Sequence, residues 1–168
     1  MIYERFEHLW LPIAIEVIIK RTAERSLNMT NSNSDYEFAN AFFYFLKTLE
    51  TLSEDASRQC EVMGNFNVAW ELREDAITDA NTVLALPGGR LSSEQREAVG
   101  RLLAALRAIP ESVANVDNTK EEHLRAMSSP SWASVRTESR SLQRILESET
   151  QRTRALLWPM SNGSSGKI

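Results

Sequence analysis

The sequence predicts an all-α fold, a single-domain helical bundle of five to six helices that are mostly antiparallel. Apolar residues recur at intervals of three and four positions through several stretches of helical length. Short breaks rich in Pro, Gly and Ser separate these stretches, and short connections favour antiparallel neighbours. No pair of alternating apolar and polar runs joined by a tight turn occurs, so no β-hairpin is predicted.

The chain has 168 residues, of which 42% are hydrophobic, a fraction too high for a disordered protein. We predict one helical domain over residues 1–158 and a flexible, Gly/Ser-rich tail over residues 159–168. The longest apolar run, residues 9–19, is shorter than the roughly 20 residues of a membrane span. Cys60 is the single cysteine and the start of the chain resembles no signal peptide, so we expect a cytoplasmic protein without disulfides.

The first predicted helix covers residues 3–26. Its middle, residues 9–19, is apolar nearly all round, which is typical of a helix at the centre of a core. The β-branched residues of 13–19 would also suit a buried strand, but no partner strand appears elsewhere. Pro12 is expected to start or kink this helix.

The second predicted helix covers residues 35–62. Ser34 and Glu37 have the spacing of a capping box at its start. Its apolar stripe is rich in aromatic residues and is interpreted as core, although part of it would also suit a homodimer interface. The stripe consists of Phe38, Phe42, Phe45, Leu46, Leu49 and Leu52, widened by Phe43 and Tyr44.

The third predicted helix, residues 67–86, has the clearest amphipathic pattern. Acidic and Thr side chains fill one face, and residues 87–89, Pro-Gly-Gly, end the helix. The opposite arc is predicted to be buried and contains Phe66, Ala69, Trp70, Leu72, Ala76, Ile77, Ala80, Val83 and Leu84.

Three further helices complete the prediction. Residues 93–109 begin with a capping box of Ser92 and Gln95 and bury Val99, Leu102, Leu103, Leu106 and Ile109. A short helix is expected over residues 119–127. The last helix is expected over residues 131–157, through Trp132, Val135, Leu142, Ile145, Leu146 and Leu156.

No catalytic or metal-binding motif is evident. The two histidines, His8 and His123, lie far apart in the sequence, and Cys60 has no second cysteine with which to hold zinc. Neither a Gly-x-Ser-x-Gly elbow nor a phosphate-binding loop occurs. We therefore predict no enzyme activity, no cofactor and no metal. Both histidines are interpreted as surface residues and Cys60 as a small core residue.

Two charged residues stand in apolar surroundings. Glu16 lies within the run 9–19, and Arg73 projects into the apolar arc of the third helix. Because a buried charge is costly unless it is paired, one hypothesis is that both reach polar contacts, including a pair with each other. The alternative is that each extends to the edge of its apolar stripe.

Charge is distributed unevenly along the chain. Residues 1–84 hold 7 Lys and Arg against 14 Asp and Glu, a net charge of −7, whereas residues 85–168 hold 12 against 9, a net charge of +3. On the third helix, Glu71, Asp75 and Asp79 are four positions apart, with Glu74 beside them. We call these four residues the acidic row.

The last helix carries the opposite charge. Arg136, Arg140 and Arg144 are also four positions apart, and we call them the basic row. The two rows could face each other or be solvated, or one or both could dock a partner. An acidic helix face is a natural lid for a basic cleft, because complementary charge speeds encounter and rejects wrong partners.

These features predict an interaction protein rather than an enzyme. Small acidic helical proteins without catalytic residues include bacterial immunity proteins, antitoxins and phage inhibitors of host defence. The expected partner is a protein or ribonucleoprotein with a basic surface, bound through the acidic row, and the basic row is a second candidate for partner binding. The alternatives are a helical enzyme whose site is assembled from scattered residues, and a nucleic-acid-binding regulator that uses the basic row. The acidic pI, near 5.3, disfavours direct nucleic-acid binding.

Overall fold

The computed structural model describes residues 33–64, 66–86 and 90–158, and every regular element within them is helical. The predicted helix over residues 3–26, with Glu16 and His8, lies outside these residues, as does the predicted tail. The described part contains eight helices, so the expected five to six was wrong. They are a helix over residues 33–53, then α2 (Ala56–Val62), α3 (Val68–Ala85), α4 (Ser93–Arg107), α5 (Glu111–Ala114), α6 (Lys120–Met127), α7 (Pro130–Ile145) and α8 (Glu147–Leu157). Their arrangement as an antiparallel bundle stays a prediction.

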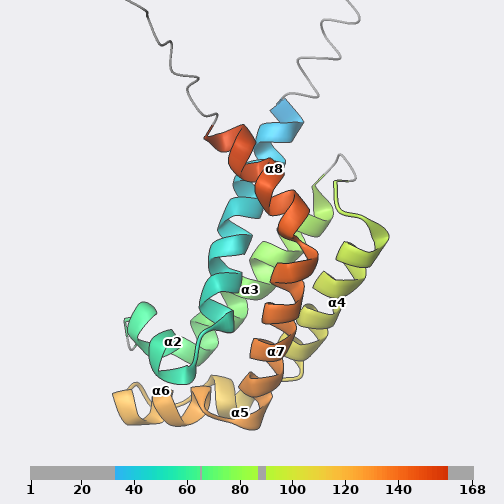
Figure 1. Ribbon diagram of the computed structural model, residues 1–168. Helices are drawn as coiled ribbons and strands as arrows, with labels where there is room; N and C mark the ends of the chain where they lie inside the picture. The colour runs from blue at the N-terminus through green and yellow to red at the C-terminus, as the bar shows by residue number, and fades with distance from the viewer. Residues whose placement is uncertain (1–32, 65, 87–89, 159–168) are drawn as a thin grey trace, which may run out of the picture.

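The long helices run side by side, and the short helices α5 and α6 lie across one end of them (Figure 1). Among the described helices, α4 packs most extensively against α7, and α2 packs against α6. Most of the apolar stripe of the 33–53 helix faces the core, as predicted: Phe42, Phe45, Leu49 and Leu52 are completely buried. They share one hydrophobic core with residues of α3, α4 and α7, including Leu72, Leu102 and Trp132. Tyr44, which was expected to widen the stripe, is exposed instead.

The single helix predicted over residues 35–62 is two helices. The chain leaves the first after residue 53, and Asp55 adopts extended backbone geometry before α2. The Asp55 carboxylate accepts a hydrogen bond from the Arg58 backbone N–H at 2.9 Å, which caps α2 and interrupts the longer helix. The predicted cap at Ser34 was also wrong, because the helix already includes residue 33.

The predictions for the middle of the chain are confirmed more closely. Helix α3 ends at Ala85, and Leu86 is extended as expected of a residue before proline. Ser92 and Gln95 form the predicted capping box of α4. The apolar stripe of α4 is buried throughout. The short helix expected over residues 119–127 is α6, with the Thr119 side chain as its cap. The four-residue α5 was not predicted.

The last helix is divided, in contrast to the prediction of one helix over residues 131–157. Helix α7 ends at Ile145 and α8 begins at Glu147, with Leu146 between them. The buried Gln95 explains the interruption, because its Nε2 donates a hydrogen bond of 3.2 Å to the Ile145 carbonyl. A side chain that takes a carbonyl from the helical hydrogen-bond ladder bends or breaks the helix.

A polar network closes the end of the 33–53 helix. Gln59, which is completely buried, donates from Nε2 to the carbonyls of Thr51 and Leu52 at 3.2 and 3.0 Å. Its Oε1 accepts from Nη1 of Arg136, which also donates to the Met127 carbonyl at 2.9 Å. Carbonyls at a helix end lack partners within the helix, so these donors satisfy groups that would otherwise be buried unpaired. The network therefore joins the 33–53 helix, α2, α6 and α7.

We expect Gln59→Ala to lower the free energy of unfolding by about 2–3 kcal/mol, because it removes the side-chain donor to the buried Leu52 carbonyl and the acceptor of one Arg136 hydrogen bond. Urea denaturation followed by far-UV circular dichroism measures this change. Gln151→Ala is the matched control: the exposed Gln151 donates only to Glu147 within α8. Its effect should stay within about 0.5 kcal/mol. Equal effects of the two substitutions would show that the network does not support the fold.

Candidate functional site

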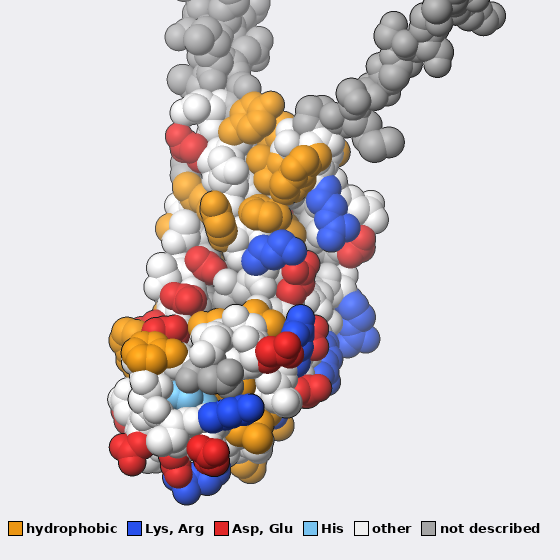
Figure 2. Space-filling view, turned by 90° about the vertical axis from the view of Figure 1, so that its left-hand side faces the viewer, with side chains coloured by type: hydrophobic (Ala, Val, Ile, Leu, Met, Phe, Trp, Pro, Cys, Tyr) orange, Lys and Arg blue, Asp and Glu red, His pale blue; other side chains and the backbone are white. Residues whose placement is uncertain are grey.

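The acidic row lies along α3. Asp75 is exposed, and Glu71, Glu74 and Asp79 are half-buried. Figure 2 shows acidic side chains spread over one face of the molecule, several of them in a line above an exposed hydrophobic group. The four carboxylates therefore reach the surface to different extents, and their contacts decide which of them are available to a partner.

Arg73 neutralises one member of the acidic row. Only 8% of its surface is exposed, and it donates from Nε to Glu74 at 3.0 Å and from Nη1 to Glu111 of α5 at 2.8 Å. Burial lowers the pKa of the guanidinium, but the hydrogen bonds and negative charges of Glu111 and Glu74 outweigh burial and raise the pKa overall. Arg73 thus reaches polar partners at the edge of the core. Its hypothetical partner Glu16 lies outside the described residues.

The other members of the row differ in their contacts. Asp79 accepts a hydrogen bond of 2.6 Å from the Thr48 hydroxyl, which ties α3 to the 33–53 helix. Partial burial, together with the negative charge of Asp79, raises the pKa of the Asp75 carboxyl. Within the described ranges, the carboxylates of Glu71 and Asp75 make no hydrogen bond or ion pair with another residue. These two carboxylates are therefore the part of the row that a cation from outside could pair with.

Within the basic row, Arg136 is half-buried, whereas Arg140 and Arg144 are exposed. Arg136 donates to Gln59 and to the Met127 carbonyl, and Arg140 donates from Nε to the Ser53 carbonyl at 3.0 Å. Burial lowers the pKa of Arg136, and the charge of Arg140 lowers it further. Arg144 is exposed and donates to the Arg140 carbonyl at 3.4 Å. Between the described side chains of the acidic and basic rows there is no ion pair.

Two aromatic residues beside the acidic row are exposed, which contradicts the predicted burial. Phe66 is 52% exposed and Trp70 is 43% exposed, whereas Ala69, Leu72, Ala76, Ala80 and Val83 of the same arc are buried as expected. Phe66 precedes α3 and Trp70 lies in its first turn, where it borders a pocket with residues of α5 and α6. The helical period locates the buried face, but it does not show how far along the helix that face is covered.

His123 is completely buried, so its predicted surface position was wrong. The ring Nε2 lies 2.7 Å from Oδ1 of Asn118, while Nδ1 is buried without a hydrogen-bond partner among the described residues. The residue lines a pocket of about 270 Å³ together with Asn67, Trp70, Ala114, Asn115 and Val116. The sequence did contain a signal: His123 precedes the buried Ala126 and Met127 by three and four positions on α6, and therefore shares their face.

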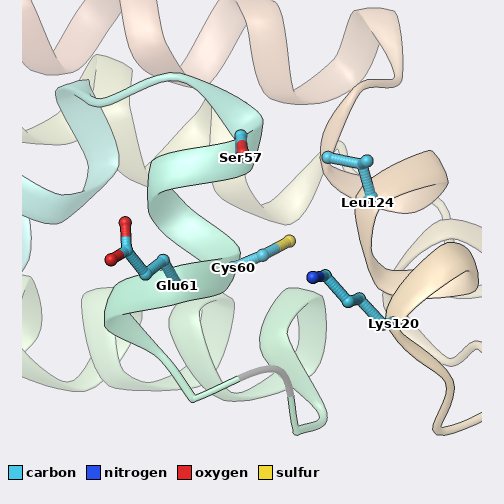
Figure 3. Close-up of a pocket in the computed structure, with 5 residues that line it drawn as sticks. All are labelled: Ser57, Cys60, Glu61, Lys120 and Leu124. Carbon is cyan, nitrogen blue, oxygen red and sulfur yellow. The ribbon is translucent and has the colours of Figure 1, made fainter.

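Cys60 is buried in the core, which confirms its prediction, and it also lines a pocket between α2 and α6. Figure 3 shows the Cys60 thiol and the Lys120 amine pointing toward each other across this pocket, with Ser57 and Leu124 nearby. Burial raises the pKa of the Cys60 thiol, and the positive charge of Lys120 opposes this in part. A thiol with a raised pKa is a poor nucleophile near neutral pH, so this pocket lacks an activated cysteine.

An aromatic patch lies where the 33–53 helix meets the end of α8. The rings of Phe43 and Trp158 meet edge to face with their centroids 5.2 Å apart, and Trp158 and Tyr44 are 56% and 64% exposed. Figure 2 shows hydrophobic side chains gathered at this end of the molecule. Part of the aromatic stripe thus faces outward, where a homodimer interface would require it. The homodimer itself stays a prediction.

Comparisons with known proteins add no functional information. The chain matches no protein-family model, and no curated protein or solved structure resembles it at a significant level.

No cluster of three or more His, Cys, Asp or Glu side chains suited to a metal ion occurs within residues 33–64, 66–86 and 90–158. Among the helices described in these ranges, none combines the length and apolarity needed to cross a bilayer.

We expect the alkylation rate of Cys60 by iodoacetamide to rise at higher pH than that of a free cysteine. The thiolate is the reacting form, and a raised pKa moves its formation to higher pH. Lys120→Met should move the midpoint of the pH profile higher still, because the opposing positive charge is lost. Lys47→Met is the control, because Lys47 does not line the Cys60 pocket: it lies on the 33–53 helix, where it pairs with Glu50. A profile that coincides with that of free cysteine would contradict the burial of this thiol.

Proposed function

We propose that the protein binds a macromolecular partner with a basic surface and inhibits or regulates it, as immunity proteins, antitoxins and phage inhibitors do. The exposed Trp70 at the end of the acidic row is the observation that carries this proposal, because it adds an apolar anchor to unpaired negative charge. The docking surface is centred on Trp70 and Glu71, which are adjacent at the start of α3, and continues to Asp75, one turn along from Glu71. Glu74 and Asp79 extend its negative charge while they are held by Arg73 and Thr48.

Such a combination suits protein recognition. Trp is enriched among the residues that dominate binding energy, and it acts best when surrounding contacts exclude water from it. Carboxylates around an aromatic anchor attract a basic surface from a distance and orient it during encounter. A protein that places this surface over the basic cleft of a nuclease or an effector complex would block the cleft to its negatively charged substrate.

The two alternative functions draw less support. An enzyme would need a second reacting group beside His123, but the other residues that line its pocket are Asn67, Trp70, Ala114, Asn115 and Val116, and none of them titrates near neutral pH. A nucleic-acid-binding regulator would need free cations on the basic row, but Arg136 and Arg140 already donate to acceptors inside the molecule. The basic row is for this reason a weaker candidate for partner binding than the acidic row.

We expect Glu71→Lys combined with Asp75→Lys to abolish partner binding without unfolding the protein, because these carboxylates make no internal hydrogen bond or ion pair in the described ranges. Affinity capture from a lysate of the source organism, with wild type and variant in parallel, identifies the partner by mass spectrometry. The partner should carry a basic surface, and raising the salt from about 50 to 500 mM should release it through charge screening.

The matched control is Glu94→Lys combined with Glu97→Lys, which makes the same change in net charge on exposed positions of α4. This variant should retain the partner. Capture that persists with the α3 variant, or that is lost equally with the α4 variant, would refute binding through the acidic row. Circular dichroism of both variants confirms that each is folded.

A further inference from the structure

The 33–53 helix carries aromatic side chains on the side turned away from the core as well as on its buried side. Tyr36 and Tyr44, about two turns apart, are 46% and 64% exposed. The rings of Phe43 and Tyr44 meet edge to face with their centroids 5.6 Å apart, and Phe43 also packs against Trp158, which borders this side of the helix. We call this side the outer face; it consists of Tyr36, Asn40, Phe43, Tyr44 and Lys47.

Residues 9–19 form the longest apolar run of the sequence, and they lie outside the described residues. Glu16 is the single charged residue among them. A run that is apolar nearly all round is unfavourable in water, so it requires an apolar surface to cover it. The outer face offers aromatic rings for this purpose, and it stands near the run in the sequence.

The sequence tethers this run close to the outer face. Residues 20–32 connect it to Asn33, where the described helix begins, three positions before Tyr36. This connection of 13 residues can extend over roughly 40 Å, whereas Lys47, at the far end of the outer face, lies about 20 Å from Asn33 along the helix. As a helix, the 11 residues of the run would be about 16 Å long, which matches the outer face from Tyr36 to Lys47.

A second copy of the chain suits the outer face less well than this run does. Each side of a stable protein interface supplies about 20–30 residues, but the outer face consists of five. Two outer faces docked on each other would also leave residues 9–19 uncovered in both copies. A tethered segment of the same chain acts at an effective concentration of about millimolar, so a small apolar face suffices to hold it.

The charge at the edge of the outer face complements Glu16. Arg154 of α8 lines a pocket with Phe43 and Lys47, is exposed, and makes no side-chain hydrogen bond or ion pair in the described ranges. Glu50 lines the same pocket, but it is already paired with Lys47 at 2.7 Å. Because a carboxylate that is covered by apolar side chains requires a cation, Arg154 is a suitable partner for Glu16.

We propose that residues 9–19 pack over the outer face of the 33–53 helix in the same chain, with Glu16 directed toward Arg154. The outer face is thus an intramolecular docking surface for the beginning of the chain. This inference does not depend on the proposed function, because the start of α3 lies at the other end of the molecule (Figure 1).

The test is paramagnetic relaxation in NMR spectra of the full-length, ¹⁵N-labelled protein. A nitroxide attached through Asn40→Cys stands on the outer face, so the amide signals of residues 9–19 should lose most of their intensity. The control label is attached through Glu121→Cys, an exposed position of α6 at the other end of the molecule, and should leave these signals intact. Wild type treated with the same reagent verifies that the buried Cys60 stays unlabelled.

A mixed sample distinguishes the same chain from a second copy. It combines ¹⁵N-labelled protein without a nitroxide and unlabelled protein that carries the nitroxide through Asn40→Cys. Loss of the signals of residues 9–19 in this mixture would assign the contact to a second copy and overturn the proposal. Intact signals in both the mixture and the directly labelled protein would overturn it as well.

Two further variants, made in the protein labelled through Asn40→Cys, test the chemistry of the contact. Tyr44→Asp places a charge beneath the apolar run and should restore the signals of residues 9–19. Arg154→Glu should restore them in part through charge repulsion, and the additional change Glu16→Arg should remove them again. Signals that stay lost with Tyr44→Asp would overturn packing on the outer face, and a charge exchange without effect would overturn the pairing of Glu16 with Arg154.

Discussion

At the end of the 33–53 helix, the backbone carbonyls of Thr51, Leu52 and Ser53 accept hydrogen bonds from side chains of other helices. Gln59 donates to the first two and Arg140 to the third, while Arg136 joins Gln59 to the end of α6. Because Gln59 and its hydrogen bond to the Leu52 carbonyl are buried, loss of this donor would leave an unpaired polar atom where the helices meet. The relative positions of the 33–53 helix, α2, α6 and α7 depend on this constraint. Apolar packing fills the core, and the polar network determines which helices meet.

The hydrogen bonds of Arg136 and Arg140 affect which charged side chains are free to meet a partner. Arg136 and Arg140 of the basic row donate hydrogen bonds to other groups of the molecule. Among the described side chains, the basic row forms no ion pair with the acidic row. On α3, by contrast, Arg73 and Thr48 hold only Glu74 and Asp79. The carboxylates of Glu71 and Asp75 are not paired within the described ranges, and Glu71 adjoins the exposed Trp70. The near-neutral total of −4 conceals this separation. The asymmetry favours a basic partner on α3 over an anionic partner on α7.

Local sequence signals predicted local structure well. The capping box of Ser92 and Gln95 and the apolar stripe of α4 depend on residues close in the chain, and both were found as expected. The break at Leu146 depends on Gln95 from another helix, and the exposure of Trp70 depends on which tertiary neighbours cover the start of α3. The burial of His123 could have been predicted from its spacing of three and four positions to Ala126 and Met127. Its polar neighbours in the sequence instead suggested a surface position. The helical spacing of the acidic row along α3 followed from the sequence, but the contacts of its members required the tertiary structure.

The central claim is that the start of α3 is the surface that meets a basic partner. Hydroxyl-radical footprinting of the isolated protein and of its complex with the captured partner tests this claim within one chain. Trp70 and Trp158 are 43% and 56% exposed, so they react comparably in the isolated protein. The account predicts that complex formation protects Trp70 from oxidation and leaves Trp158 unchanged. Protection of Trp158 with unchanged oxidation of Trp70 would contradict it.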